Sequence, residues 1–225
     1  RSLADNYNTL NEKKIFSYLK YGFKSMEQET QGFFKGIFKI DAGTNLLIDR
    51  NCNIKSEKFW KPSIRDNNKV SEKQCISLIK ENFNKKIKEI CNSQLKIGLS
   101  LSGGIDSNFL LGFFAKNLGN NINTYSIVDE DKRYNEEDLI DYASKFHKVK
   151  NKKIYLSQKE NYLEKLINLT KYHDKPVSTI SYFVQSFIYE RMNKDKIKIC
   201  ISGNGADELF AGYYHHYILY YNSLK

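Results

Sequence analysis

An apolar run that ends in a glycine-rich turn and continues into a helix-like stretch is the feature that most constrains this chain. Residues 97–101 (IGLSL) suit a buried strand, residues 102–107 read SGGIDS, and apolar residues return at Phe109. Adjacent glycines let backbone N–H groups approach an anion, and the hydroxyls of Ser102 and Ser107 add donors at the positive end of the helix. This order predicts a phosphate-sized anion site.

Asp106 lies in the same turn and changes the kind of ligand expected. A carboxylate repels a phosphate unless a divalent cation lies between them, so the turn favours Mg²⁺ with a polyphosphate. The alternative is a turn that binds nothing, because glycine and serine commonly join a strand to a helix.

A second segment repeats this order. Residues 196–201 (KIKICI) alternate as a strand does and are followed by SGNGADELFAGYY at residues 202–214. Turns at the carboxyl ends of neighbouring parallel strands face one crevice, so Asp106 and Asp207 would hold one cation from two sides. Asp207 and Glu208 also suit the first turn of a helix, a purely structural alternative that is compatible with metal binding.

These two segments resemble the signature loops of the asparagine synthetase class of PP-loop ATP pyrophosphatases. Upstream, GIFKIDAG at residues 36–43 and KFWKP at residues 58–62 are similar to the segment that links the family's glutaminase and synthetase domains. YNE at residues 134–136 and DKP at residues 174–176 are similar to two weaker family motifs. The matches cover most of residues 30–217 in the family's order.

The resemblance implies an ATP-dependent amide-forming ligase. A carboxylate, with aspartate expected, would attack the α-phosphorus of Mg²⁺-bound ATP to give an acyl-adenylate and pyrophosphate. Ammonia from a glutaminase domain would then form the amide. The residues that match family positions on the pyrophosphate or beside the adenosine are Leu101, Ser102, Gly103, Gly104, Asp106, Ser107, Ile127, Ser202 and Gly203, and those on the metal and in catalysis are Asp106 and Asp207.

Two residues depart from the family's pattern. Asn204 and Lys175 stand where the family usually has acidic residues. Either change hints at an acceptor other than aspartate, although Asn204 also suits a turn of no consequence. Three alternatives stay open: an amidotransferase acting on another carboxylate in polysaccharide or secondary metabolism, a nucleotide-binding module without turnover, and a PP-loop RNA-modifying enzyme.

Charge and cysteine usage favour small-molecule substrates over nucleic acid. The net charge is +10, but lysine is spread along the whole chain, which is typical of a solvated surface. The four cysteines have no C-x-x-C spacing, so free thiols in a reducing compartment are expected, without a zinc site. No apolar run approaches the ~18 residues of a membrane span, so we expect a cytoplasmic protein with no membrane partner.

The organisation expected from the resemblance is two-part. Residues 1–70 would be the end of a glutaminase domain with its linker, and residues 71–225 the first part of a synthetase domain. Arg1 stands first and the first cysteine is Cys52, so this chain is not expected to hydrolyse glutamine. The full-length protein would form a homodimer.

The alternation of strand-like and helix-like segments predicts an α/β fold with an open parallel sheet and helices on both faces. The resemblance implies that this sheet is of the PP-loop or adenine nucleotide alpha hydrolase type, preceded by a small extended remnant of another domain. Ser71 and Gln74 form a capping box for a helix that buries one face. The aromatic and histidine residues at 213–217 are expected to pack rather than bind. The expected strands are 97–101, 122–128, 153–156 and 196–202, with helices at 9–24, about 139–146, 158–171 and 179–193, an extended pair at 32–49, and a polar connector at 50–70.

Overall fold

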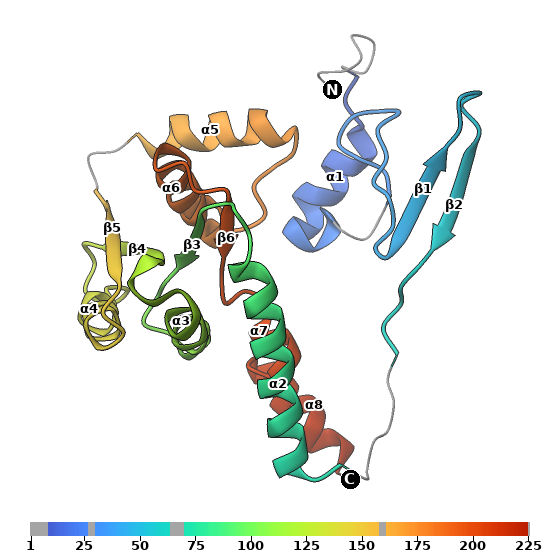
Figure 1. Cartoon of the computed structure of the whole chain (residues 1–225). Coiled ribbons are helices and arrows are strands. Elements are labelled where there is room, and N and C mark those ends of the chain that lie inside the picture. Colours follow the sequence, from blue (N-terminus) through green and yellow to red (C-terminus); the bar gives the residue numbers. More distant parts are fainter. Residues whose placement is uncertain (1–8, 27–29, 64–69, 158–160, 225) are drawn as a thin grey trace. The chain divides into compact units, whose positions relative to one another are not determined.

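The computed structural model describes residues 9–26, 30–63, 70–157 and 161–224, which form two compact units. One unit combines residues 1–69 with 161–183, and the other combines residues 70–160 with 184–225 (Figure 1). The assignment of residues 1–70 to a glutaminase domain and of residues 71–225 to a synthetase domain stays a prediction. No helix in the described ranges is long and apolar enough to cross a membrane.

The first unit contains two α-helices and a hairpin: α1 (Glu12–Tyr21), continued by the 3₁₀ helix η1 (Gly22–Met26), β1 (Thr44–Ile48), β2 (Ile54–Lys58) and α5 (Tyr162–His173). Asn11 caps α1, since its side chain accepts a hydrogen bond from the N–H of Lys14. The helix expected at residues 9–24 is confirmed but begins at Glu12, and the helix expected at residues 158–171 is confirmed from Tyr162 onward in its described part.

The hairpin lies further along the chain than the sequence predicts. β1 pairs antiparallel with β2, whereas residues 32–40 contribute only isolated bridges such as Gln31 with Phe38. The turn is made by Asp49, whose side chain accepts hydrogen bonds from the backbone N–H groups of Asn51 and Asn53. Asp and Asn make such turns because their short side chains bond to nearby backbone. The expected connector at residues 50–70 was therefore wrong for residues 54–58.

The second unit is built on a four-stranded parallel sheet. Its strands β3 (Ile97–Ser100), β4 (Asn123–Asp129), β5 (Lys150–Leu156) and β6 (Ile199–Ile201) lie in the order β5-β4-β3-β6. The helices of this unit are α2 (Glu72–Cys91), α3 (Ile105–Leu118), α4 (Glu137–Phe146), α6 (Ile180–Lys194, from Val184 onward), α7 (Ala206–Phe210) and α8 (Tyr214–Ser223), with the 3₁₀ helix η2 (Gly119–Asn121).

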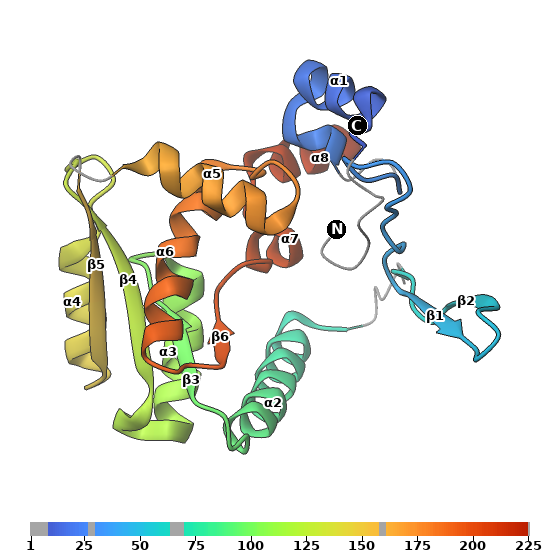
Figure 2. The same ribbon diagram turned by 90° about the horizontal axis from the view of Figure 1, so that it is seen from above.

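Helices cover both faces of this sheet, which confirms the predicted fold class. Leu99 packs with Leu111 of α3 and Ile140 of α4 in one core cluster. On the other face, Tyr125 packs with Met192 of α6. Figures 1 and 2 show α3 and α4 on one side and α6 on the other.

Gly98 explains how close α6 approaches the sheet. A β-carbon at this position would lie 3.0 Å from Tyr125 and 3.1 Å from Met192. A larger residue would force the side chains of Tyr125, Ile197 and Met192 to shift, because packed interiors leave little spare space.

The helices α2 and α4 bury less of their apolar residues than the helical spacing of those residues predicts. The capping box of α2 is present, with both Ser71–Gln74 hydrogen bonds, but only its second half packs: Ile87 is 3% exposed and Ile76 is 44% exposed. In α4 the buried residues are Ile140 and Ala143, whereas Leu139, Tyr142 and Phe146 are exposed. Apolar spacing alone does not say which face of a helix meets the sheet.

A polar network joins the end of α6 to the sheet. The buried Tyr125 hydroxyl donates to Asp195 Oδ2 over 2.8 Å, and Lys152 Nζ donates to the same oxygen over 2.7 Å. The hydrogen bond from Lys152 is the largest cause that lowers the pKa of Asp195. Burial, followed by the hydrogen bond with Asp195, raises the pKa of Tyr125.

Asp195→Asn should lower the stability of the protein at neutral pH and reduce its loss in acid. Because the pKa of Asp195 is lower in the folded state than its unfolded value of about 3.9, its stabilisation is complete above that value and disappears as pH falls through the folded-state pKa. Urea unfolding between about pH 7 and pH 2 tests this. Glu190→Gln, on the exposed surface of the same helix, is the control; an Asp195→Asn profile identical to wild type would contradict the prediction.

Candidate active site

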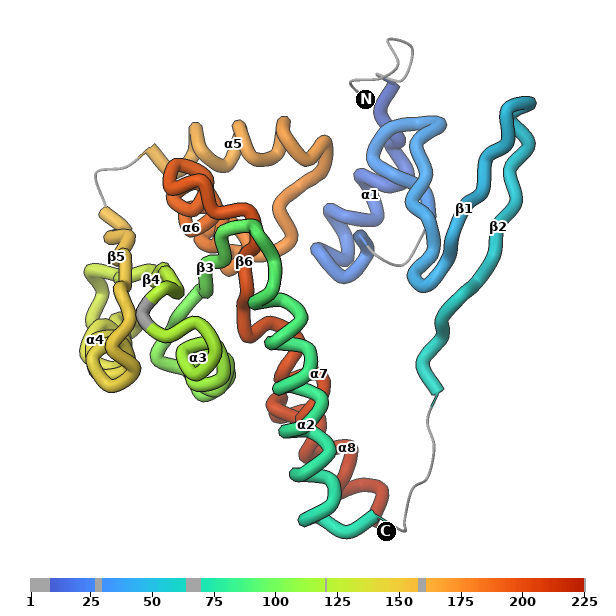
Figure 3. The backbone as a smooth tube through the Cα atoms, in the orientation of Figure 1, coloured from blue at the N-terminus to red at the C-terminus, as the bar shows by residue number. Residues whose placement is uncertain are grey.

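The first glycine-rich turn lies where β3 ends and α3 begins (Figure 3). Leu101 still follows the sheet, since its N–H donates to the carbonyl of Tyr125 over 2.8 Å. Gly104 is the N-cap of α3 and provides no side-chain cap. Asp106 therefore stands in the first helical turn, where the helix dipole favours negative charge.

Ser107 holds the turn in shape. Ser107 is buried, with 6% of its surface exposed. Its hydroxyl accepts a hydrogen bond from the N–H of Ser102 over 3.1 Å and lies 3.2 Å from the carbonyl oxygen of Gly104. The N–H of Gly104 in turn donates to Ser102 Oγ over 3.2 Å. Asn108, which sequence analysis did not single out, donates from Nδ2 to the carbonyls of Ser102 and Gly104. The position of Asn108, an amide side chain directly after the glycine-rich turn, is the sequence signal that could have identified it.

The amide of Gly103 already donates to a carboxylate of the protein itself. The N–H of Gly103 donates to Glu136 Oε2 over 2.9 Å. A carboxylate on this amide indicates that the turn presents an N–H in a position suited to an anionic oxygen. The sequence marked Glu136 only as part of a weak motif, and the contact depends on the fold bringing together residues 33 positions apart.

The second turn follows β6 and touches the first. Ile201 of β6 pairs with Leu99 of β3, so Ser202 and Gly203 leave the same edge of the sheet as Ser102. A β-carbon on Gly203 would lie 3.0 Å from Asp106 Cβ and 3.1 Å from the backbone nitrogen of Ser107. The structure thus brings the two predicted turns into direct contact.

The two aspartates occupy different environments. No hydrogen bond or ion pair among the described residues uses the Asp106 carboxylate. Asp207 lies in α7 against the Cα of Gly212, where any β-carbon would overlap its Oδ1, and its carbonyl accepts from the Gly212 N–H over 2.9 Å. Gly212 is therefore required beside Asp207, a constraint that the sequence did not reveal.

Asp106 and Asp207 supply only part of the ligand shell that a divalent cation needs. Within the described ranges no three His, Cys, Asp or Glu side chains gather as a metal site. Mg²⁺ usually takes one or two carboxylates and completes its shell with phosphate oxygens and water. Two carboxylates, from Asp106 and Asp207, match this usual coordination of Mg²⁺. Their role as ligands stays a prediction.

The expected adenosine neighbours lie on opposite faces of the sheet. Leu101 is 2% exposed and packs in the α3 cluster, whereas Ile127 packs beside Tyr125 and α6. Ser202 and Gly203 are half-buried at the carboxyl edge. Contact of these residues with adenosine stays a prediction.

The residues that depart from the family pattern have neutral or exposed surroundings. Asn204 Nδ2 donates to Gln185 Oε1 of α6 over 3.4 Å, so an amide pair stands at this position. Lys175 is exposed and belongs to the first unit. In the predicted aromatic cluster, Tyr213 donates to Glu208 Oε1 over 2.9 Å and packs edge-on against His216.

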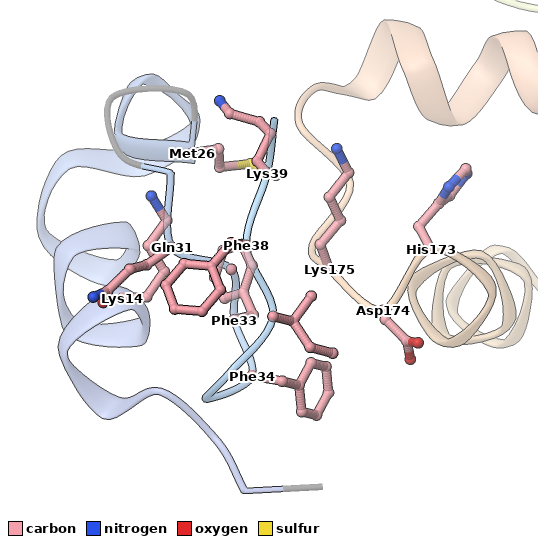
Figure 4. A pocket seen from close by; sticks show the side chains of 12 residues that line it. Lys14, Met26, Gln31, Phe33, Phe34, Phe38, Lys39, His173, Asp174 and Lys175 are labelled. Atoms are coloured by element: carbon pink, nitrogen blue, oxygen red, sulfur yellow. The ribbon is translucent and has the colours of Figure 1, made fainter. Parts of the chain in front are cut away.

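The first unit contains a cavity of about 320 Å³. None of the residues of the two turns lines it. Figure 4 shows phenylalanine side chains on one side and the residues at the end of α5 on the other: Phe33, Phe34 and Phe38, and His173, Asp174 and Lys175.

The comparisons with known proteins agree with the resemblance. Residues 78–224 match the family model described as asparagine synthase, so the chain belongs to the asparagine synthase family. It is 22% identical over 94% of its length to asparagine synthetase [glutamine-hydrolyzing] 1 of Bacillus subtilis, of which it covers 32%. It is 26% identical over 92% of its length to putative asparagine synthetase [glutamine-hydrolyzing] 2 of Methanocaldococcus jannaschii, of which it covers 39%.

The chain therefore spans between 32% and 39% of the length of these two relatives. Among solved structures it is similar to an NH3-dependent NAD synthetase from Campylobacter jejuni. That likeness has a TM-score of 0.43 and 20% identity, and it covers 61% of this chain and 60% of the other.

Gly203→Ala should separate the two turns. Its β-carbon would meet backbone and Cβ atoms that have no room to move, at a cost of about 1–3 kcal/mol. We expect weaker ATP binding in calorimetry. Gly112→Ala within α3, where the nearest atom is 3.7 Å away, is the control and should bind as wild type does. Unchanged ATP affinity in Gly203→Ala would show that the contact is not needed.

Proposed function

We propose that this protein is the ATP-using part of an amide-forming ligase of the asparagine synthetase type. It would activate a carboxylate, aspartate first among the candidates, as an acyl-adenylate, with release of pyrophosphate, and ammonia would then replace AMP. The observation that carries this proposal is the contact of Gly203 with Asp106, which unites the two turns at one edge of the sheet. Membership of the asparagine synthase family supports it.

The chemistry assigned to the first turn is to hold pyrophosphate as the leaving group. Amide N–H groups and hydroxyls donate hydrogen bonds to charge that builds up on the departing oxygens, and the N-terminus of α3 adds a favourable dipole. Ser102 and Ser107 can reorient their hydroxyls from acceptors to donors when an anion arrives. The chain's own residues therefore act by position and charge rather than by covalent chemistry.

Asp106 and Asp207 are the residues that would hold Mg²⁺. The ion would neutralise phosphate charge and orient the polyphosphate for in-line attack. The turn has no Gly-Lys-Ser or Gly-Lys-Thr sequence, which argues against transfer of the γ-phosphate by a P-loop mechanism. Following the family resemblance, we assign cleavage to the bond between the α- and β-phosphates.

The identity of the acceptor is the least constrained part of the proposal. The amide pair of Asn204 and Gln185 lies on the second turn and offers neutral donors and acceptors where the family usually has an acid. A site with this pair favours an acceptor with fewer positive groups than aspartate. The second candidate is therefore an acceptor carboxylate other than aspartate, as in polysaccharide or secondary metabolism.

Asp106→Asn should weaken MgATP binding and turnover in the full-length protein. The change keeps the size of the side chain but removes the charge offered to the cation. Binding is measured by calorimetry with and without Mg²⁺, and a loss of about tenfold or more is expected, as for removal of a charge-assisted contact. Asp138→Asn, an exposed acid in the first turn of α4, is the control. Equal MgATP affinity in Asp106→Asn and wild type would refute the metal role.

The products should be AMP and pyrophosphate, and repeated turnover should require both a carboxylate and ammonium. Chromatography of labelled nucleotide across a panel of carboxylic acids, including aspartate, measures them. Turnover with aspartate supports the first acceptor, and turnover with another acid alone supports the second. ADP and phosphate as products would rule out the proposed bond cleavage.

A further inference from the structure

The carboxylate of Glu136 lies on the first turn although it belongs to another element. Glu136 is the residue before α4, yet its side chain does not cap that helix. Asn135 bonds there instead, since its Oδ1 accepts from the N–H of Glu137 over 2.8 Å. Glu136 is thus left to accept the N–H of Gly103 over 2.9 Å.

Close packing holds the turn beside the start of α4. A β-carbon on Gly103 would lie 2.9 Å from Leu139 Cδ1 and 3.2 Å from Glu136 Cβ. The turn and the helix therefore approach each other as closely as a glycine allows. The carboxylate reaches the amide because of this packing and not because of local sequence.

Glu136 and a phosphate oxygen would compete for the same hydrogen. The amide of Gly103 has one N–H, and an ionised carboxylate can only accept hydrogen bonds. A polyphosphate in the turn would also bring negative charge next to the carboxylate. The serine hydroxyls can rotate and donate to the polyphosphate, but the Glu136 carboxylate has to move away.

A role for Glu136 as a third metal ligand is the opposing interpretation. It would place Glu136 with Asp106 and Asp207 around one cation. In the part of the chain that the structure describes, no three acidic, histidine or cysteine side chains gather in that way. The geometry favours competition at the amide over shared coordination.

We propose that Glu136 is an anion gate on the first turn, meaning that its carboxylate occupies the Gly103 amide when the turn is empty and leaves when polyphosphate binds. The gate weakens the hold of the turn on free pyrophosphate and so favours its release. The proposal rests on the proposed function, because it takes pyrophosphate as the natural ligand of this turn.

The test compares binding of inorganic pyrophosphate by calorimetry in the full-length protein, in EDTA and with Mg²⁺. Glu136→Gln removes the charge and keeps the shape, so it should tighten binding in EDTA by about three- to tenfold, a moderate effect because the contact is exposed. Glu136→Ala should tighten it at least as much. Asp138→Asn removes the same charge from the same helix end without touching the turn, and it should change affinity by less than about twofold.

Each outcome decides between distinct conclusions. Tighter binding in both Glu136 variants and not in Asp138→Asn supports the gate. Unchanged or weaker binding in folded Glu136 variants, with wild type still binding pyrophosphate and ATP, overturns the gate and leaves the proposed function intact. Weaker binding confined to the Mg²⁺ condition assigns Glu136 to the metal instead and overturns the gate. Failure of the wild type to bind either ligand overturns both proposals, and matched thermal melting curves show that the variants are folded.

Discussion

The pairing of β3 with β6 is the constraint on which the rest of the second unit depends. Because these parallel strands are neighbours in register, the turns that follow them leave the sheet at the same edge. Gly203 then packs on Asp106 with no space for a side chain between them. Ligands of open parallel sheets bind at such an edge, so this one pairing creates the candidate site.

The backbone amides at the start of the first turn already have hydrogen-bond partners from the protein. The amides of its first three residues bond to side-chain oxygens: Ser102 to Ser107, Gly103 to Glu136, and Gly104 to Ser102. Two of these partners are hydroxyls that can reverse their direction, and one is a carboxylate that cannot. At these three amides, binding an anion is therefore an exchange of partners, whereas no side chain caps the first turn of α3.

Much of the fold could be predicted because strands and helices carry distinct periods. The apolar pattern and capping residues predicted the four parallel strands, and they predicted the helices that the described residues form at Glu12–Tyr21, Tyr162–His173 and Ile180–Lys194. The hairpin was misplaced because the turn at Asp49 lies within a run of polar residues. The burial of α2 was also misjudged, since amphipathic spacing shows that a helix has an apolar stripe but not how much of it is covered.

The sequence by itself determined the two glycine-bearing turns, their acidic residues and the family, because short-range chemistry and spacing are written in consecutive residues. Only the tertiary structure decided that Glu136 bonds to Gly103, that Gly203 touches Asp106 and that Gly212 lies against Asp207. The contacts of Glu136 and Gly203 join residues far apart in the chain, and that of Gly212 depends on how the chain turns after α7. Such contacts follow from strand order, helix packing and backbone path, which no local pattern encodes.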